Sequence, residues 1–114
     1  MARNRSELVI IYWRDIPAQV NAQVGRERFK AMMPDRFGRG IDRAKRKAKI
    51  YTSHEDIAQW RRENRPLTGD PQAAANAVAA ELDAAFPHER LRELIVAAGF
   101  DENATEVSQE QEQS

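Results

Sequence analysis

A nearly unbroken apolar run at residues 8–13 is the feature that most constrains how this chain can fold. The run is rich in β-branched and aromatic side chains, which favour a strand, and its lack of polar positions is typical of a strand covered on both faces. We therefore expect it in the middle of a sheet. Pro17 fixes its own backbone and restricts the preceding residue to extended conformations, so a turn is predicted at residues 14–17.

Two further segments follow with weaker strand patterns. Residues 20–24 alternate apolar and polar side chains, which is the period of a half-buried strand, and Gly25 suits the turn after it. Residues 28–33 complete an antiparallel meander as a third strand, although their apolar side chains also fit one face of a helix. The predicted sheet therefore has two or three strands.

Helices are predicted for most of the remaining chain. The first, at residues 35–49, is basic and carries a narrow apolar stripe. The second begins at Ser53, whose hydroxyl suits an N-cap, and turns Ile57 and Trp60 inward. The stripe of the first helix consists of Phe37, Ile41, Ala44 and Ala48.

The last two helices have clearer boundaries. Asp70 and Pro71 are a typical N-cap and first residue of a third helix, and a fourth is predicted at residues 87–98. Gly99 suits the left-handed C′ position after it, with Phe100 folding back on the last turn. The expected inward residues are Ala74, Ala77, Val78, Leu82 and Ala85 in the third helix, and Leu91, Leu94, Ile95 and Ala98 in the fourth.

These segments predict the α+β class. A chain of 114 residues suits one domain, which we place at residues 1–100. We expect a small antiparallel N-terminal sheet of two to three strands, packed by three to four helices. Residues 101–114 are acidic and glutamine-rich, a composition that predicts a disordered tail.

Composition narrows the location and the chemistry. The chain has no cysteine, which excludes disulfides, thiolate metal sites and cysteine nucleophiles. The first residues lack the apolar core of a signal peptide, and no stretch approaches the roughly 20 apolar residues of a membrane span. We therefore expect a cytoplasmic protein without a membrane partner.

Charge is distributed unevenly although it sums to zero. Residues 1–50 hold 13 Lys and Arg against 5 Asp and Glu, whereas residues 51–114 hold 5 against 13. One interpretation is a pair of solvated faces of opposite charge. The other is a basic surface for an anionic partner, screened by the acidic half.

Sequence motifs for catalysis are missing. His54 and His88 are the only histidines, and their spacing does not suit a metal site. The serines lie outside any nucleophile motif, and the glycines form no phosphate-binding loop. We therefore predict no catalytic residues, no metal and no cofactor.

Two groups of residues are candidates for binding. The first surrounds the end of the opening strand, where aromatic and charged side chains of the kind found at interface anchors follow one another. The second is a row of arginines along one side of the first helix, which suits a nucleic acid or another anion. The strand-end group is Tyr12, Trp13, Arg14, Asp15 and Gln19, with Trp60 and Arg61; the arginine row is Arg36, Arg39, Arg43 and Arg46.

Several segments resemble one protein family. They are VIIYWRDIPAQV at residues 9–20, MPDRF at 33–37, IDRA at 41–44 and EDIAQWRR at 55–62, with LTGDP at 67–71 and FP at 86–87. Together they resemble the small bacterial "virulence factor" family, whose module also occurs in larger conserved virulence factor proteins. The basic residues at 45–47 depart from that pattern. The resemblance implies an accessory role beside one-carbon and corrinoid methyl-transfer systems, and no reaction mechanism.

We therefore expect a non-catalytic accessory module that binds a protein partner through the strand-end group. An alternative is a nucleic-acid or anion binder that uses the basic helix at residues 36–49. A third is an enzyme subunit in which Arg14 and Asp15 lie in a cleft.

Overall fold

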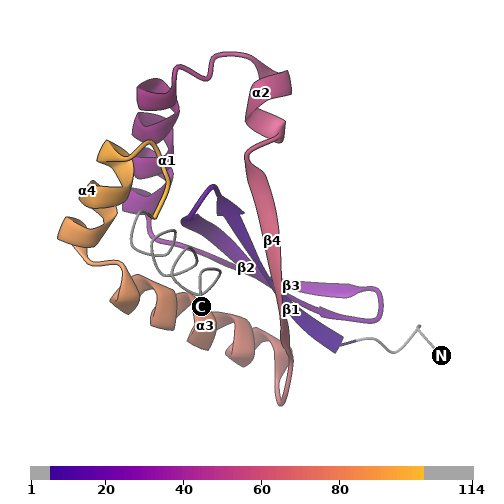
Figure 1. Ribbon diagram of the computed structural model, residues 1–114. Coiled ribbons are helices and arrows are strands. Elements are labelled where there is room, and N and C mark those ends of the chain that lie inside the picture. The colour runs from indigo at the N-terminus through magenta and orange to yellow at the C-terminus, as the bar shows by residue number, and fades with distance from the viewer. Residues whose placement is uncertain (1–5, 102–114) are drawn as a thin grey trace, which may run out of the picture.

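The computed structural model describes residues 6–101 as four strands and four helices (Figure 1). The predicted α+β class is confirmed, and the segment that also fitted a helix is a strand. The disordered tail predicted for residues 101–114 lies outside the described residues except for Asp101. The elements are β1 Ser6–Trp13, β2 Ile16–Val24, β3 Glu27–Met32, α1 Asp35–Ala48, α2 Ser53–Ile57, β4 Trp60–Pro66, α3 Pro71–Ala85 and α4 His88–Val96.

The four strands form one antiparallel sheet in the order β3-β2-β1-β4. The apolar strand β1 is therefore central, as predicted. Ile10 pairs with Val20 of β2 on one side and with Glu63 of β4 on the other. Because both neighbours of β1 are antiparallel, a tight turn at residues 14–15 suffices to join it to β2.

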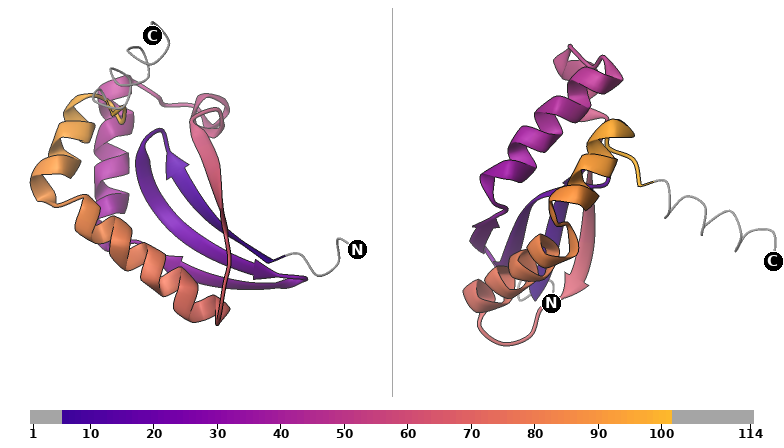
Figure 2. Two further views of the ribbon diagram at one scale, coloured as in Figure 1. Left: turned by 60° about the horizontal axis from the view of Figure 1, so that its bottom comes forward. Right: turned by 90° about the vertical axis from the view of Figure 1, so that its left-hand side faces the viewer.

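The sheet has one face covered by helices and one without them. The long helices α1, α3 and α4 lie on the same side of it (Figure 2). Ile10 and Tyr12 belong to the core on that side, whereas Val9 alternates to the opposite face. Val9 is nevertheless only 1% exposed, and its cross-strand partners are Asn21 and Asn64. The face of β1 that points away from the helices is thus buried by side chains of the neighbouring strands rather than by a helix.

The core forms where α1 crosses between the sheet and α4. Phe37, Ile41 and Ala44 are buried, which confirms most of the stripe predicted for this helix. The rings of Phe37 and Phe86 meet edge to face, with centroids 6.2 Å apart. Burying a side chain of this size contributes about 2–3 kcal/mol, so these contacts fix the position of α1.

β4 is the element that the sequence analysis missed. The predicted second helix ends at Ile57, which is exposed rather than inward, and Trp60 begins a strand. Thr52, not Ser53, caps the short helix α2, because its hydroxyl oxygen accepts from the Glu55 N–H at 3.2 Å. β4 is an edge strand made mostly of charged residues, so it lacks an apolar period, and its pairing with β1 determines its conformation.

α3 starts as predicted, and Ala74, Val78 and Leu82 pack on the core as expected, but two of its predicted inward alanines do not. The Asp70 carboxylate accepts from the Ala73 N–H at 2.8 Å, which confirms the N-cap. Ala77 and Ala85 are exposed, and Ala75 is buried instead. A helix with so many alanines has small apolar side chains on every side, so its sequence does not fix which side is inward.

The end of α4 packs against the centre of the domain. Ala98 occupies the C′ position predicted for Gly99, with φ 60°, and Gly99 follows with φ 97°. The Gly99 N–H donates to the Leu94 carbonyl oxygen at 2.7 Å. A Cβ at Gly99 would lie 2.6 Å from the ring of Trp13, so only glycine permits this close approach.

We predict that Gly99→Ala lowers the free energy of unfolding by about 2–4 kcal/mol, because it adds both a clash and backbone strain. Gly38→Ala is the matched control. Gly38 lies in α1 with nothing within 4 Å of its missing Cβ, so the change should raise stability by up to about 1 kcal/mol. Urea denaturation followed by tryptophan fluorescence measures both. Equal stability of Gly99→Ala and the wild type would contradict the packing described.

Candidate functional site

Arg14 ties the β1–β2 turn to two distant parts of the chain. Its backbone is left-handed, with φ 54°. Its Nε donates to the Gln59 side-chain oxygen at 2.9 Å, and Nη1 donates to the Ala98 carbonyl oxygen at 2.8 Å. The guanidinium also lies 4.3 Å from the ring centroid of Phe100. Burial lowers the pKa of Arg14, which still remains charged. Arg14 therefore acts as a bridge inside the domain.

Asp15 completes the same bridge. One carboxylate oxygen accepts from Arg61 Nη2 at 3.0 Å, and the other accepts from the Asp101 N–H at 2.6 Å. Its own N–H donates to the Gly99 carbonyl oxygen at 2.8 Å. Both oxygens of Asp15 are thus engaged by the domain itself.

Tyr12 and Gln19 are also held internally. The Tyr12 hydroxyl donates to Glu63 at 3.4 Å, and the guanidinium of Arg61 lies 4.1 Å from the Tyr12 ring centroid. Burial, followed by the nearby Glu63 carboxylate, raises the pKa of Tyr12. The Gln19 amide donates to the Asn21 side-chain oxygen at 3.0 Å.

Asp56 joins a buried tryptophan to an exposed one. Trp13 Nε1 donates to one oxygen of its carboxylate at 2.9 Å, and Trp60 Nε1 donates to the other at 3.2 Å. The Lys45 ammonium lies 3.0 Å from the same carboxylate. Burial alone raises the pKa of Asp56, but the hydrogen bonds from Lys45, Trp60 and Trp13 outweigh it and hold the pKa below its usual value.

The lowered pKa of Asp56 predicts a pH-dependent contribution to stability. The ionised Asp56 carboxylate contributes fully to stability above the pKa that Asp56 has in the unfolded chain, about 4. This contribution is lost as the pH falls through the lower pKa that Asp56 has in the folded state. Asp56→Asn removes the charge at every pH. The stability difference between the wild type and Asp56→Asn should therefore be largest above about pH 5 and shrink toward pH 2, as measured by urea denaturation. A difference that does not change with pH would contradict this arrangement.

The predicted strand-end group therefore separates into two parts. Trp13 is 0% exposed, and Arg14 and Asp15 have partners within the domain, so these residues support the fold. Trp60 and Arg61 are exposed and lie at the surface. An alanine at Trp13 would consequently test folding more than binding.

The exposed part continues across the helix-free face of the sheet. One rung of this face carries Met32, Gln19, Ile11 and Arg62 on successive strands. Strand alternation places Trp60 on the same face as Arg62. Met32 is 63% exposed and Trp60 38% exposed, so large apolar groups meet solvent here. We call Ile11, Met32, Trp60 and Arg62, together with Arg28, the Trp60 surface.

Trp60 borders two hollows. One, of about 370 Å³, lies over the sheet and is lined by Ile11, Asn21, Arg28, Trp60, Arg61 and Arg62. The other, of about 490 Å³, lies between Trp60 and α1, where Met33, Pro34 and Ile41 give it a mainly apolar wall. The indole of Trp60 thus stands between a basic hollow and an apolar one.

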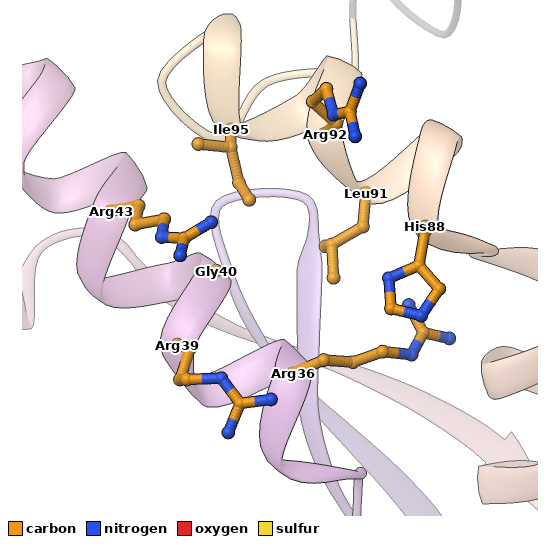
Figure 3. A pocket seen from close by; sticks show the side chains of 8 residues that line it. All are labelled: Arg36, Arg39, Gly40, Arg43, His88, Leu91, Arg92 and Ile95. Carbon is orange, nitrogen blue, oxygen red and sulfur yellow. The ribbon is translucent and has the colours of Figure 1, made fainter.

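The arginine row of α1 lies in a different place. Arg36, Arg39 and Arg43 face α4, and together with His88 and Arg92 of that helix they line a groove of about 260 Å³ (Figure 3). We call this the arginine groove. Arg46, the fourth residue of the predicted row, does not line it. The sequence analysis missed His88 and Arg92, because only the packing of α4 against α1 brings them to the row.

Gly40 brings the two helices close enough to form this groove. A Cβ at Gly40 would lie 3.2 Å from the Ile95 Cδ1 atom, tighter than ordinary contact. Leu91 and Ile95 project from α4 into the space opposite α1 (Figure 3). The groove therefore has an apolar wall on one side and guanidinium groups on the other.

Residues 6–101 contain neither a metal-binding cluster nor a membrane-spanning helix. No group of three or more His, Asp or Glu side chains there is arranged to hold a metal ion. None of the helices in that range has the length and apolarity to cross a membrane. What the described residues present is a small α+β domain with a helix-free sheet face and a basic groove on its helical side.

Comparison with known protein families identifies the family of this chain. Residues 11–95 match the family described as "Virulence factor", so the chain belongs to that family, as the sequence resemblance indicated. Searches against curated proteins and against solved structures found no match.

Proposed function

We propose that this member of the virulence factor family is a non-catalytic binding module, and that it docks a protein partner on the Trp60 surface. The observation that carries the proposal is the exposed indole of Trp60 between two hollows, one over the helix-free face of the sheet and one beside α1. Tryptophan, arginine and methionine are the residues most enriched at protein interfaces. The Trp60 surface contains all three.

Trp60 is also held in place before any partner arrives. Its Nε1 donates to Asp56, and the Lys45 ammonium lies 5.6 Å from its ring centroid. Because the ring is already oriented, little side-chain freedom remains to be lost on binding. A fixed, partly exposed indole is well suited to act as an interface anchor.

The two hollows indicate the chemistry of the partner. The hollow over the sheet has three arginines and no Asp or Glu in its lining as described. The hollow beside α1 is mainly apolar. We therefore propose a partner segment that places an apolar side chain against Trp60 and an acidic one near Arg28 and Arg62.

The carboxylates of the strand end favour binding over catalysis. Asp15 and Asp56 accept several hydrogen bonds each from the domain, and neither lines the two hollows. A general acid or base must reach a substrate, which these groups do not. An accessory role beside one-carbon and corrinoid methyl-transfer systems, which the family resemblance implies, fits a module that acts by docking.

We predict that Trp60→Ala weakens partner binding at least about tenfold, because a central indole anchor is removed. Cross-linked pull-down of the tagged chain from its own cells, with quantitative proteomics, measures the loss. Met32→Glu provides a second test, since Met32 is well exposed and its substitution should leave the fold intact. The same partner should be lost with both variants.

Tyr51→Ala is the matched control, because Tyr51 is an aromatic residue that is 76% exposed and lines neither hollow. It should retain the partner. A partner that survives Trp60→Ala and Met32→Glu contradicts the proposed surface, as does the absence of any protein enriched by the wild type. Self-association of the purified chain that both variants abolish would replace the foreign partner with a second copy.

A further inference from the structure

The arginine groove gathers positive charge that the described residues do not neutralise. Arg39, Arg43 and Arg92 form no salt bridge with any described carboxylate. The lining of the groove, within the described chain, contains no Asp or Glu. Cations held together in a concave site repel one another and focus a positive potential into it. An anion in the groove would relieve that repulsion.

Arg36 lies at the same groove in a more buried setting. Its Nη2 donates to the Asp83 carboxylate at 2.6 Å, which neutralises one of the charges. Its Nη1 is buried and has no hydrogen-bond partner within residues 6–101. An unpaired buried donor of this kind costs stability, and an anionic oxygen is the acceptor that best satisfies a guanidinium. Arg36 therefore lines the groove with a guanidinium whose buried Nη1 the described residues leave without an acceptor.

The arrangement favours a compact anion over a long one. The guanidinium groups come from two helices and share one hollow of about 260 Å³. Lys47 and Lys49, which also belong to the basic segment, do not line it, and nor does Arg46. A nucleic-acid backbone spaces its phosphates along a line, so it is best matched by an extended track of cations. Several cations around one hollow match a single group of high negative charge.

Two properties of the groove specify the chemical class further. Guanidinium groups pair with phosphate through two parallel hydrogen bonds, and several of them balance a charge of two or more. Leu91 and Ile95 provide an apolar wall beside these donors. We propose that the arginine groove binds a small phosphorylated organic molecule, with its phosphate groups on Arg36, Arg39 and Arg43 of α1 and Arg92 of α4. The groove lies on the α4 side of α1, and Arg39 is the one lining residue that it shares with the hollow between Trp60 and α1.

Calorimetric titration with inorganic pyrophosphate tests the phosphate part of this proposal. We expect binding that weakens about tenfold for each guanidinium removed in Arg39→Gln, Arg43→Gln and their double variant. Amide shifts in two-dimensional NMR spectra should fall on α1 and α4. Arg46→Gln is the matched control, because it removes the same charge from the same helix outside the groove, and it should change the affinity less than about twofold.

The stability of the free protein separates a binding role from a structural one. If the cations exist for a ligand, Arg43→Gln without ligand should leave Tm unchanged or raise it, because repulsion is removed. Pyrophosphate should raise the Tm of the wild type and of Arg46→Gln, but not that of the double variant. A lower Tm for Arg43→Gln without ligand, together with no effect of pyrophosphate on the wild type, would make the arginines structural and overturn the proposal.

Two further probes identify the source of the phosphate. ADP carries an organic part beside two phosphates and should bind at least as tightly as pyrophosphate, because it also covers the apolar wall. A single-stranded oligothymidine of about 12 nucleotides should bind more weakly than either. Tighter binding of the oligonucleotide, weakened equally by Arg46→Gln and Arg43→Gln, would mean a nucleic-acid track. No binding of pyrophosphate or ADP at about 10 mM would overturn the proposal outright.

Discussion

The arrangement of the whole domain depends on the bridge made by Arg14. Its guanidinium joins the β1–β2 turn to the Gln59 side chain before β4 and to the Ala98 carbonyl after α4. Segments that are 45 and 84 residues away in sequence are thereby fixed against one turn. Asp15 holds the same two segments through Arg61 and through the Asp101 N–H. The bridge thus adds to the pairing of β4 with β1 and to the packing of α4, and it holds the start of the strand that carries Trp60 and the end of α4 against the same turn.

The division of charge between the two halves of the chain has a structural explanation in part. Two of the ion pairs that cross between the halves start from α1, Arg36 with Asp83 at 2.6 Å and Lys45 with Asp56 at 3.0 Å. They attach the basic helix α1 to α3 and to α2. The other arginines of α1 that line the groove form no ion pair with a described carboxylate, so they account for its positive charge. The charge asymmetry thus contributes to assembly, and adjacent positions of the same helix form the groove proposed above to bind phosphate.

The sequence predicted the central strand and the class of fold, because these depend on local patterns of apolar residues. The predicted arginine row meets one groove with three of its four members, Arg36, Arg39 and Arg43. The sequence also identified the segment at residues 12–15 as unusual. It could not show that Arg14 donates to a carbonyl group at the other end of the chain, since such a partner leaves no local pattern. The sequence did not predict β4 for a related reason. Its charged residues show no apolar period, and only pairing with β1 makes them a strand. His88 and Arg92 join the groove only through helix packing.

Asp56 has a further consequence because one carboxylate serves two indoles. One oxygen is bound by the buried Trp13 and the other by the exposed Trp60. Any displacement of Trp60 from Asp56 removes one of the hydrogen bonds that keep the carboxylate ionised, and so increases its affinity for a proton. By reciprocity, protonation of Asp56 weakens its hydrogen bond to Trp60. If the proposed docking on the Trp60 surface displaces Trp60, it is therefore thermodynamically linked to proton uptake by this one partly buried carboxylate.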